Sequence, residues 1–320
     1  MSQPHGQPPG VPPVRRRRRG LARHIYAVRR LLVMCLVFAL FAGIFGLVQL
    51  VSGDDDAGDG PAASTSSASA STAAASSSST SAAATTTTVK PMTVPTADDP
   101  AEILVLGDSD AGNFGPPLEA ALEATGVVAL AIDYHVSSGL ARPDYFDWPA
   151  YMLQVVPAIN PDIVVATFGG NDAQGLRNAD GVWVVGYNPG QGKDDTAWRE
   201  EYGRRVGAAM DYLSAGNRTL IWVGIPSDDE AVNTARLQVQ DEVVRAEAAK
   251  RPLVIYVDTW AMFGGVDGGW AESIVDPRDG VGKDVRRSDG FHLNETGGEI
   301  LAWHLEQIVL DVLRERGADL

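Results

Sequence analysis

The chain has 320 residues, with 26 Lys and Arg against 41 Asp and Glu and a formal net charge of −15. Eight arginines precede residue 31 with no acidic residue among them, so the rest of the chain is more acidic still. Because phosphate binding requires a basic face, this balance excludes a nucleic-acid partner for the main domain. The one cysteine, Cys35, excludes an intramolecular disulfide.

The N-terminal part of the chain divides into three segments of different composition. Residues 1–30 carry the arginine cluster and are expected to be disordered and cytoplasmic. Residues 31–51 contain no charged side chain. As a helix rising ~1.5 Å per residue they span about 30 Å, which predicts a transmembrane helix, with a cleaved signal peptide as the alternative. Residues 52–98, rich in Ser, Thr and Ala, are expected to form a flexible linker outside the cell membrane.

Residues 99–320 alternate between strand and helix patterns. Short apolar runs typical of buried parallel strands lie at 102–106, 127–132, 162–167, 220–225 and 253–257. Helical stretches lie between and after them, at 113–125, 148–158, 196–215, 228–250 and 295–316. This alternation predicts an α/β domain, doubly wound and flavodoxin-like, with a five-stranded parallel sheet. Such sheets bind ligands at the carboxyl ends of their strands.

Four short polar segments contain residue types that can take part in catalysis. Three of them, 107–110, 136–139 and 169–172, follow predicted strands, and the fourth, 289–292, precedes the last predicted helix. A serine is a weak nucleophile unless a base takes its proton, and His292 can be that base for Ser109. Asp289, three residues earlier, can hydrogen-bond the other imidazole nitrogen on a tight turn. The backbone N–H groups of Ser109 and Gly139 and the amide of Asn171 can donate to the oxyanion of a tetrahedral intermediate.

These segments resemble the signature blocks of SGNH (GDSL-like) hydrolases, in which Ser, Gly, Asn and His follow one another in the same chain order. The resemblance covers roughly residues 101–320 and implies the SGNH hydrolase fold, together with the nucleophile, oxyanion donors and Asp–His pair given above. The chain is similar in particular to bacterial cell-envelope proteins of this family. The first block reads GDSDAGNFG rather than a GDSLT-type form. In the second block Ser138 is an alternative to Gly139.

Long segments beside the predicted site provide candidate substrate contacts. Residues 173–198 include a strand-like run at 182–187 and three side chains that could bind a sugar, Arg177, Trp183 and Tyr187. The alternative is a β-hairpin that only covers the end of the sheet. Asp108 and Asp172, next to the nucleophile and the amide, are two further candidates.

A second long segment, 263–288, ends in Arg286 and Arg287. These arginines could bind acidic substrate groups or pair with surface carboxylates. No group of His, Cys and Asp residues has the spacing of metal ligands, so we expect neither a metal nor a cofactor.

The sequence therefore predicts a membrane-anchored serine esterase. The expected reaction is removal of acyl groups, above all O-acetyl groups, from an envelope carbohydrate outside the cell membrane. One alternative is an O-acyltransferase supplied by a membrane acyltransferase partner. Another is a carbohydrate-binding domain without catalytic activity.

Overall fold

The computed structural model describes residues 93–320. The predicted segments 1–30 and 31–51 and nearly all of the linker at 52–98 lie outside the described residues. Within residues 93–320, none of the helices combines the length and the apolar character that a bilayer crossing requires.

A five-stranded parallel sheet forms the centre of the described domain. Its strands are adjacent in the order β2-β1-β3-β6-β7, which is the flavodoxin-like order predicted from the sequence. The strands are β1 (Ala101–Gly107), β2 (Val128–Tyr134), β3 (Ile163–Thr167), β6 (Thr219–Val223) and β7 (Val254–Val257). All four pairings are parallel, and β1 lies between β2 and β3.

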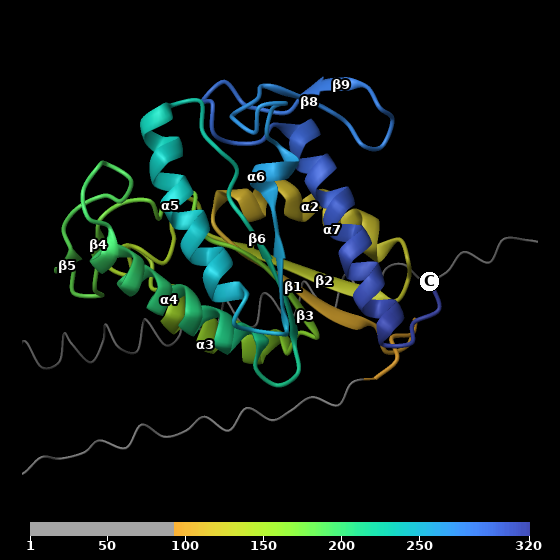
Figure 1. Ribbon diagram of the computed structural model, residues 1–320. Coiled ribbons are helices and arrows are strands. Elements are labelled where there is room, and N and C mark those ends of the chain that lie inside the picture. The colour runs from red at the N-terminus through yellow and green to blue at the C-terminus, as the bar shows by residue number, and fades with distance from the viewer. Residues whose placement is uncertain (1–92) are drawn as a thin grey trace, which may run out of the picture. The chain divides into compact units, whose positions relative to one another are not determined.

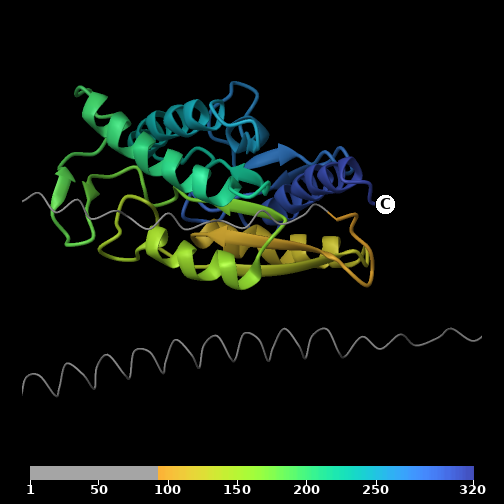
Figure 2. The same cartoon turned by 90° about the horizontal axis from the view of Figure 1, so that it is seen from below.

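Helices cover both faces of the sheet (Figure 1 and Figure 2). One face packs against α2 (Ser109–Glu123) and α7 (Glu295–Glu315). The other face packs against α3 (Trp148–Ile159), α4 (Thr196–Ser214) and α5 (Ala231–Ala248). The resulting layers place a hydrophobic core on each side of the strands.

The alternation of side chains along β1 divides the two cores. Ile103 and Val105 point into the core with α2 and α7, whereas Leu104 and Leu106 point into the other. All four side chains are completely buried. Because a strand buried on both faces needs apolar residues at every position, the sequence reads as a continuous apolar run. Burial of each such side chain stabilises the fold by about 1.5–3 kcal/mol.

The start of α2 differs from the sequence prediction. The helix was expected from residue 113, but it begins at Ser109, with Asp108 as its N-cap. The side chain of Asp108 accepts a hydrogen bond from the Asp110 N–H at 3.0 Å. Pro116 and Pro117 lie inside the helix and weaken the helical pattern, because proline lacks the backbone donor.

The two long segments beside the sheet contain short antiparallel pairs. Residues 173–198 form a hairpin of β4 (Leu176–Arg177) and β5 (Trp183–Val185), so the strand-like run at 182–187 is confirmed in its centre. Before α7, the chain forms α6 (Thr259–Met262) and a pair of β8 (Ser273–Val275) and β9 (Gly282–Asp284).

Candidate active site

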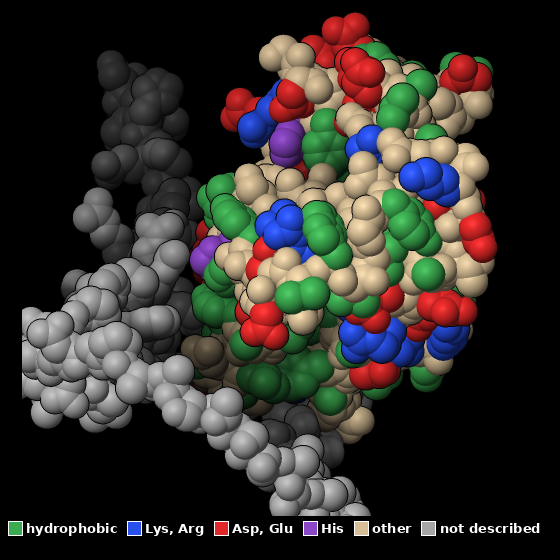
Figure 3. All heavy atoms as spheres, turned by 90° about the vertical axis from the view of Figure 1, so that its left-hand side faces the viewer, with side chains coloured by type: hydrophobic (Ala, Val, Ile, Leu, Met, Phe, Trp, Pro, Cys, Tyr) green, Lys and Arg blue, Asp and Glu red, His purple; other side chains and the backbone are tan. Residues whose placement is uncertain are grey.

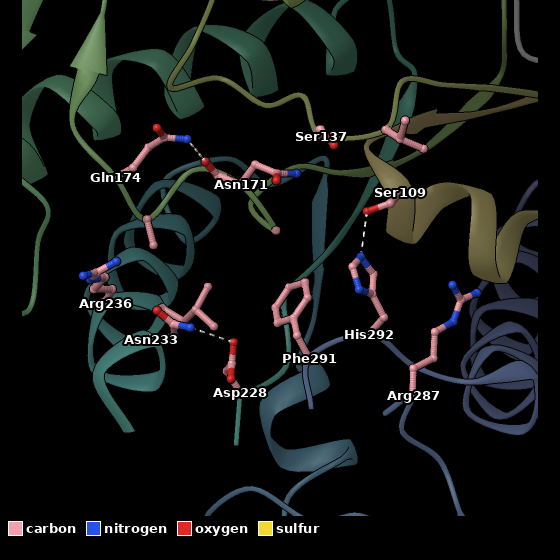
Figure 4. Close-up of a pocket in the computed structure, with 14 residues that line it drawn as sticks. Ser109, Ser137, Asn171, Gln174, Asp228, Asn233, Arg236, Arg287, Phe291 and His292 are labelled. Atoms are coloured by element: carbon pink, nitrogen blue, oxygen red, sulfur yellow. Dashed lines mark hydrogen bonds between the residues drawn. The ribbon is translucent and has the colours of Figure 1, made fainter. Parts of the chain in front are cut away.

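A pocket of about 530 Å³ contains Ser109, Asn171 and His292. Ser109 follows β1 and Asn171 follows β3, so both lie at the carboxyl edge of the sheet. His292 comes from the loop before α7, 183 residues after Ser109 in the chain. Figure 4 shows the three side chains pointing into the same cavity.

Ser109, His292 and Asp289 form a continuous chain of hydrogen bonds. The Ser109 Oγ lies 3.0 Å from His292 Nε2, and His292 Nδ1 lies 2.9 Å from Asp289 Oδ2. Because a carboxylate only accepts, Nδ1 carries the proton and Nε2 is left to accept the serine proton. The other oxygen of Asp289 accepts from the backbone N–H groups of Phe291 and His292, at 3.1 and 3.0 Å. The tight turn expected from the three-residue spacing is therefore present.

The carboxyl of Asp289 stays ionised more readily than an ordinary aspartate. Partial burial alone would raise its pKa. Hydrogen bonds from the side chain and backbone of His292 and from the Phe291 N–H outweigh burial, and the pKa lies below its usual value. A negative charge is thus held beside the imidazole, where it stabilises the imidazolium.

Asp108 fixes the backbone around Ser109 but does not line the pocket. Its side chain is completely buried and accepts from the N–H groups of Gly169 at 3.2 Å and Gly170 at 3.0 Å, besides that of Asp110. Burial, together with the nearby carboxyl of Asp110, raises the pKa of Asp108 well above its usual value. The prediction of Asp108 as a substrate contact is wrong, because no surface of the side chain is exposed. It instead ties the start of α2 to the loop after β3.

Asp172, like Asp108, holds two loops together and is not the predicted substrate contact. Its completely buried carboxylate accepts from the N–H groups of Leu140 at 2.9 Å and Ala141 at 2.8 Å. The hydroxyl of Tyr202 on α4 donates to it at 2.9 Å. Burial raises the pKa of Asp172, although these donors oppose the shift. The side chain therefore joins the loops after β2 and β3, and that prediction is corrected.

The loop after β2 presents Ser137 to the pocket rather than Gly139. Ser137 lines the pocket with a φ of 61°, whereas Gly139 is buried and is not part of the lining. A Cβ at Gly139 would lie 2.0 Å from Asp172 Oδ1, so close packing against this carboxylate accounts for the glycine. The Asn171 amide does reach the loop and donates to the Ser138 carbonyl at 3.2 Å.

Arg177, Trp183 and Tyr187 do not line the pocket. The Arg177 guanidinium lies 4.0 Å from the centre of the Trp183 ring and 3.7 Å from the Asp144 carboxylate. Tyr187 donates its hydroxyl to the backbone carbonyl of Asp194 at 3.0 Å. Trp183 is half-exposed on β5. Figure 3 shows hydrophobic side chains interspersed with charged ones on the face of the domain that it presents. The structure favours the alternative, a hairpin beside the sheet end, over a contact within this pocket.

Several lining residues were not predicted from the sequence. Gln174 follows Asn171 closely, and Asn233 and Arg236 come from α5. The position of α5 directly after β6 was the available signal, because helices that follow parallel strands begin at the ligand-binding edge. Of the two adjacent arginines, Arg287 lines the pocket, whereas Arg286 is buried and donates to the Phe291 carbonyl at 2.8 Å.

Comparisons with known proteins give one family match. The family described as "Protein of unknown function (DUF459)" matches residues 102–308. No curated protein matches the chain in sequence.

Solved structures with a similar chain path include three esterases or lipases. A GDSL-like lipase from Bacteroides thetaiotaomicron is 14% identical with a TM-score of 0.46, covering 69% of this chain and 92% of its own. An acetylxylan esterase from Geobacillus stearothermophilus, a catalytic mutant, is 17% identical with a TM-score of 0.45, covering 68% and 95%. A carbohydrate esterase of family 3 from Talaromyces cellulolyticus is 14% identical with a TM-score of 0.44, covering 67% and 99%.

Proposed function

We propose that this chain, which belongs to the DUF459 family, is a serine hydrolase that cleaves carboxylic esters. The observation that carries the proposal is the Ser109–His292–Asp289 hydrogen-bond chain, open to a cavity of about 530 Å³. A serine within 3.0 Å of a histidine that is itself oriented by a carboxylate is the arrangement that activates a hydroxyl. We propose that this hydrogen-bond chain acts in an SGNH-type mechanism.

The reaction proceeds in two halves. The Ser109 Oγ attacks the ester carbonyl carbon while its proton passes to His292 Nε2, and the carbonyl electrons move onto oxygen. Collapse of this intermediate breaks the bond to the alcohol, which leaves with the proton from His292. Water then gives its proton to His292 and attacks the acyl-serine. The acid departs and the proton returns to Ser109.

The oxyanion needs donors on the pocket wall. Ser109 is the first residue of α2, where backbone N–H groups have no carbonyl partner within the helix. The Asn171 side chain lines the same wall. Ser137, which lines the pocket in the loop expected to supply Gly139, is the third candidate. These donors, together with the positive end of the helix dipole, stabilise the developing negative charge.

We place the preferred substrate among acyl esters, such as O-acetyl groups, of an envelope carbohydrate. The arginine-rich segment at 1–30, the uncharged run at 31–51 and the Ser/Thr/Ala-rich linker at 52–98 support a domain tethered outside the cell membrane. A long linker lets such a domain reach polymer around its anchor. Protease added to intact cells is expected to remove the domain, and protection of the domain would contradict this location.

The test of the activity is hydrolysis of p-nitrophenyl acetate by the full-length protein. Ser109→Ala is expected to abolish turnover and covalent labelling by a fluorophosphonate. Ser273→Ala, an exposed serine on β8, is the matched control and is expected to behave as the wild type. A folded wild-type protein with neither turnover nor label would overturn the proposal and favour a carbohydrate-binding domain. A labelled protein that transfers acetyl to a glycan but not to water would identify a transferase.

A further inference from the structure

Two arginines of the pocket differ from the other arginines of residues 93–320. Within this part of the chain, every arginine except Arg236 and Arg287 pairs with a carboxylate or donates to a backbone carbonyl. Both exceptions line the cavity that contains Ser109. The Nε of Arg236 is buried and has no hydrogen-bond partner among the described residues.

An arginine left without a partner is unexpected in so acidic a chain. The formal net charge of −15 means that carboxylates are abundant, and most surface arginines find one. Withdrawing part of a guanidinium from water without a compensating hydrogen bond costs free energy. The Nε of Arg177 is buried and unpaired as well, but the Arg177 guanidinium lies 3.7 Å from the Asp144 carboxylate, whereas Arg236 has no ion pair among the described residues and lines the cavity. Arg236 therefore has the properties of a binding group for an anion.

The one carboxylate on the same side of the pocket does not satisfy Arg236. Asp228 lines the cavity, but one of its oxygens accepts from the Glu230 N–H at 2.8 Å and the other from the Asn233 amide at 3.3 Å. Its side chain is nearly completely buried. Asp228 thus orients Asn233 and leaves the guanidinium of Arg236 to the cavity.

Arg287, unlike Arg236, acts on a nearby carboxyl, that of Asp110. Burial raises the pKa of the Asp110 carboxyl, and the charges of His292, Arg286 and Arg287 lower it. A carboxyl therefore already lies in the field of Arg287. The buried Nε of Arg236, which has no hydrogen-bond partner among the described residues, has no counterpart in Arg287, so Arg236 is the stronger anion site of the two.

The positions of the two arginines indicate where a charged group of the substrate would lie. In Figure 4, Arg236 on α5 lies across the cavity from Ser109, and Asn171 and Phe291 lie between them. Arg287 lies on the side of His292. An ester whose carbonyl carbon is at the Ser109 Oγ reaches Arg236 only through a chain that crosses the pocket. The charged group is therefore separated from the reacting carbonyl by several bonds.

We propose that the pocket selects esters that carry a negatively charged oxygen group, such as a carboxylate, which Arg236 binds at the end of the cavity opposite Ser109. This inference rests on the proposed esterase function. Planar guanidinium groups bind carboxylates through two parallel hydrogen bonds, which fix orientation as well as charge. The charged group can belong to the acyl part of the ester or to the alcohol part, and the two sources are separated by experiment.

The test compares matched charged and neutral esters with the full-length protein. On the acyl side, p-nitrophenyl hemisuccinate is compared with p-nitrophenyl pentanoate. On the alcohol side, m-carboxyphenyl acetate is compared with its neutral methyl ester. Because a hydrogen bond to a charged group is worth more than a neutral one, kcat/KM is expected to favour the charged member of one pair by about tenfold or more.

Variants assign this preference to Arg236. Arg236→Gln is expected to remove the charged-over-neutral ratio, and Arg236→Lys to restore part of it, because lysine keeps the charge but loses the two-pronged geometry. Arg199→Gln, which breaks an exposed ion pair with Glu242 on α4 and α5, is the matched control and keeps the wild-type ratio.

The outcomes separate this inference from the esterase proposal. Ser109-dependent hydrolysis with equal kcat/KM for both members of both pairs overturns the anion site and leaves the esterase standing. If no ester is hydrolysed, calorimetric binding of p-nitrophenyl hemisuccinate and p-nitrophenyl pentanoate to Ser109→Ala decides the matter without catalysis. Tighter binding of the hemisuccinate, weakened by Arg236→Gln, supports the site, and equal binding of the two esters overturns it.

Discussion

The amide of Asn171 is the side-chain group whose role in catalysis can be tested most directly. It lines the pocket and makes one hydrogen bond, to the Ser138 carbonyl at 3.2 Å. Loss of one oxyanion donor lowers kcat by about 10²–10³. The kcat of Asn171→Ala is therefore expected to be lower than that of the wild type by this factor. The melting temperature is expected to change little, because one such hydrogen bond is worth only about 1 kcal/mol.

The control for Asn171→Ala is Asn178→Ala in the hairpin. The Asn178 side chain accepts from the Val182 N–H at 2.9 Å and does not line the pocket, so kcat is expected to remain at the wild-type value. Stopped-flow or steady-state rates with p-nitrophenyl acetate make the comparison. Near-wild-type turnover by Asn171→Ala would show that the amide is not an oxyanion donor.

The proposed mechanism sets the expected pH dependence of the activity. Only a neutral imidazole accepts the Ser109 proton, so kcat/KM is expected to fall in acid. The pKa of Asp289 lies below its usual value, although partial burial opposes this shift, because hydrogen bonds from His292 hold the carboxylate ionised. A lowered pKa means that the carboxylate is lost only in stronger acid, so a single acid limb is expected. Rates measured from about pH 4 to about pH 9 test this, and a flat profile would exclude a histidine base.

At the scale of single elements, the contact between the loops after β2 and β3 explains why residue 139 is glycine. A Cβ there would lie 2.0 Å from Asp172 Oδ1, and that carboxylate cannot move away without losing the N–H groups of Leu140 and Ala141. Gly139→Ala is therefore expected to destabilise the domain by about 1–3 kcal/mol, the range for overpacking a buried site. Thermal or denaturant unfolding measures the change.

Gly186→Ala is the matched control for Gly139→Ala. Nothing lies within 4 Å of a Cβ at Gly186, which follows β5 at the surface. Its free energy of unfolding is expected to equal that of the wild type or to rise slightly, because alanine restricts the unfolded chain. If both variants unfold alike, the contact of Gly139 with Asp172 does not constrain the loop.

Apolar runs and tertiary contacts differ in how far the sequence reveals them. Each of the five parallel strands was predicted within two residues of its ends, because strands buried on both faces need uninterrupted apolar residues. The start of α2 could not be predicted, since Pro116 and Pro117 interrupt the helical pattern while packing and the Asp108 cap keep the helix. Residues buried by tertiary contacts, such as Asp172 with Tyr202, carry no local signal of their burial.

At the scale of the whole molecule, candidate site residues that lie beside the ends of strands or helices could be predicted from the sequence. Residues whose position in the pocket depends on the packing of a helix could not. The structure brings the predicted residues Ser109, Asn171 and His292 into one pocket, because each lies close to the end of a strand or the start of a helix. Arg236 was missed because its place in the pocket depends on the side of α5 that faces the cavity, 65 residues after Asn171. Conversely, Trp183 and Arg177 have suitable chemistry, but they stack on each other outside the pocket.

The proposed membrane anchor gives a prediction for the full-length chain. Residues 31–51 contain no charged side chain, and transfer of such a run into a bilayer is strongly favourable. The full-length protein is therefore expected in the membrane fraction and to resist extraction by high salt and alkali. A variant that lacks residues 1–51 is expected in the soluble fraction with unchanged kcat/KM, because the residues that line the pocket lie between Ser109 and His292.

Deletion of residues 1–14 is the matched control for this truncation. It shortens the N-terminus but keeps the arginine cluster and the run at 31–51, so the protein is expected to stay in the membrane fraction. Activity assays and immunoblots of both fractions measure the distribution. Recovery of the full-length chain in the soluble fraction would contradict the proposed membrane anchor. Sedimentation of the variant that lacks residues 1–51 with membranes would instead assign membrane binding to residues after 51.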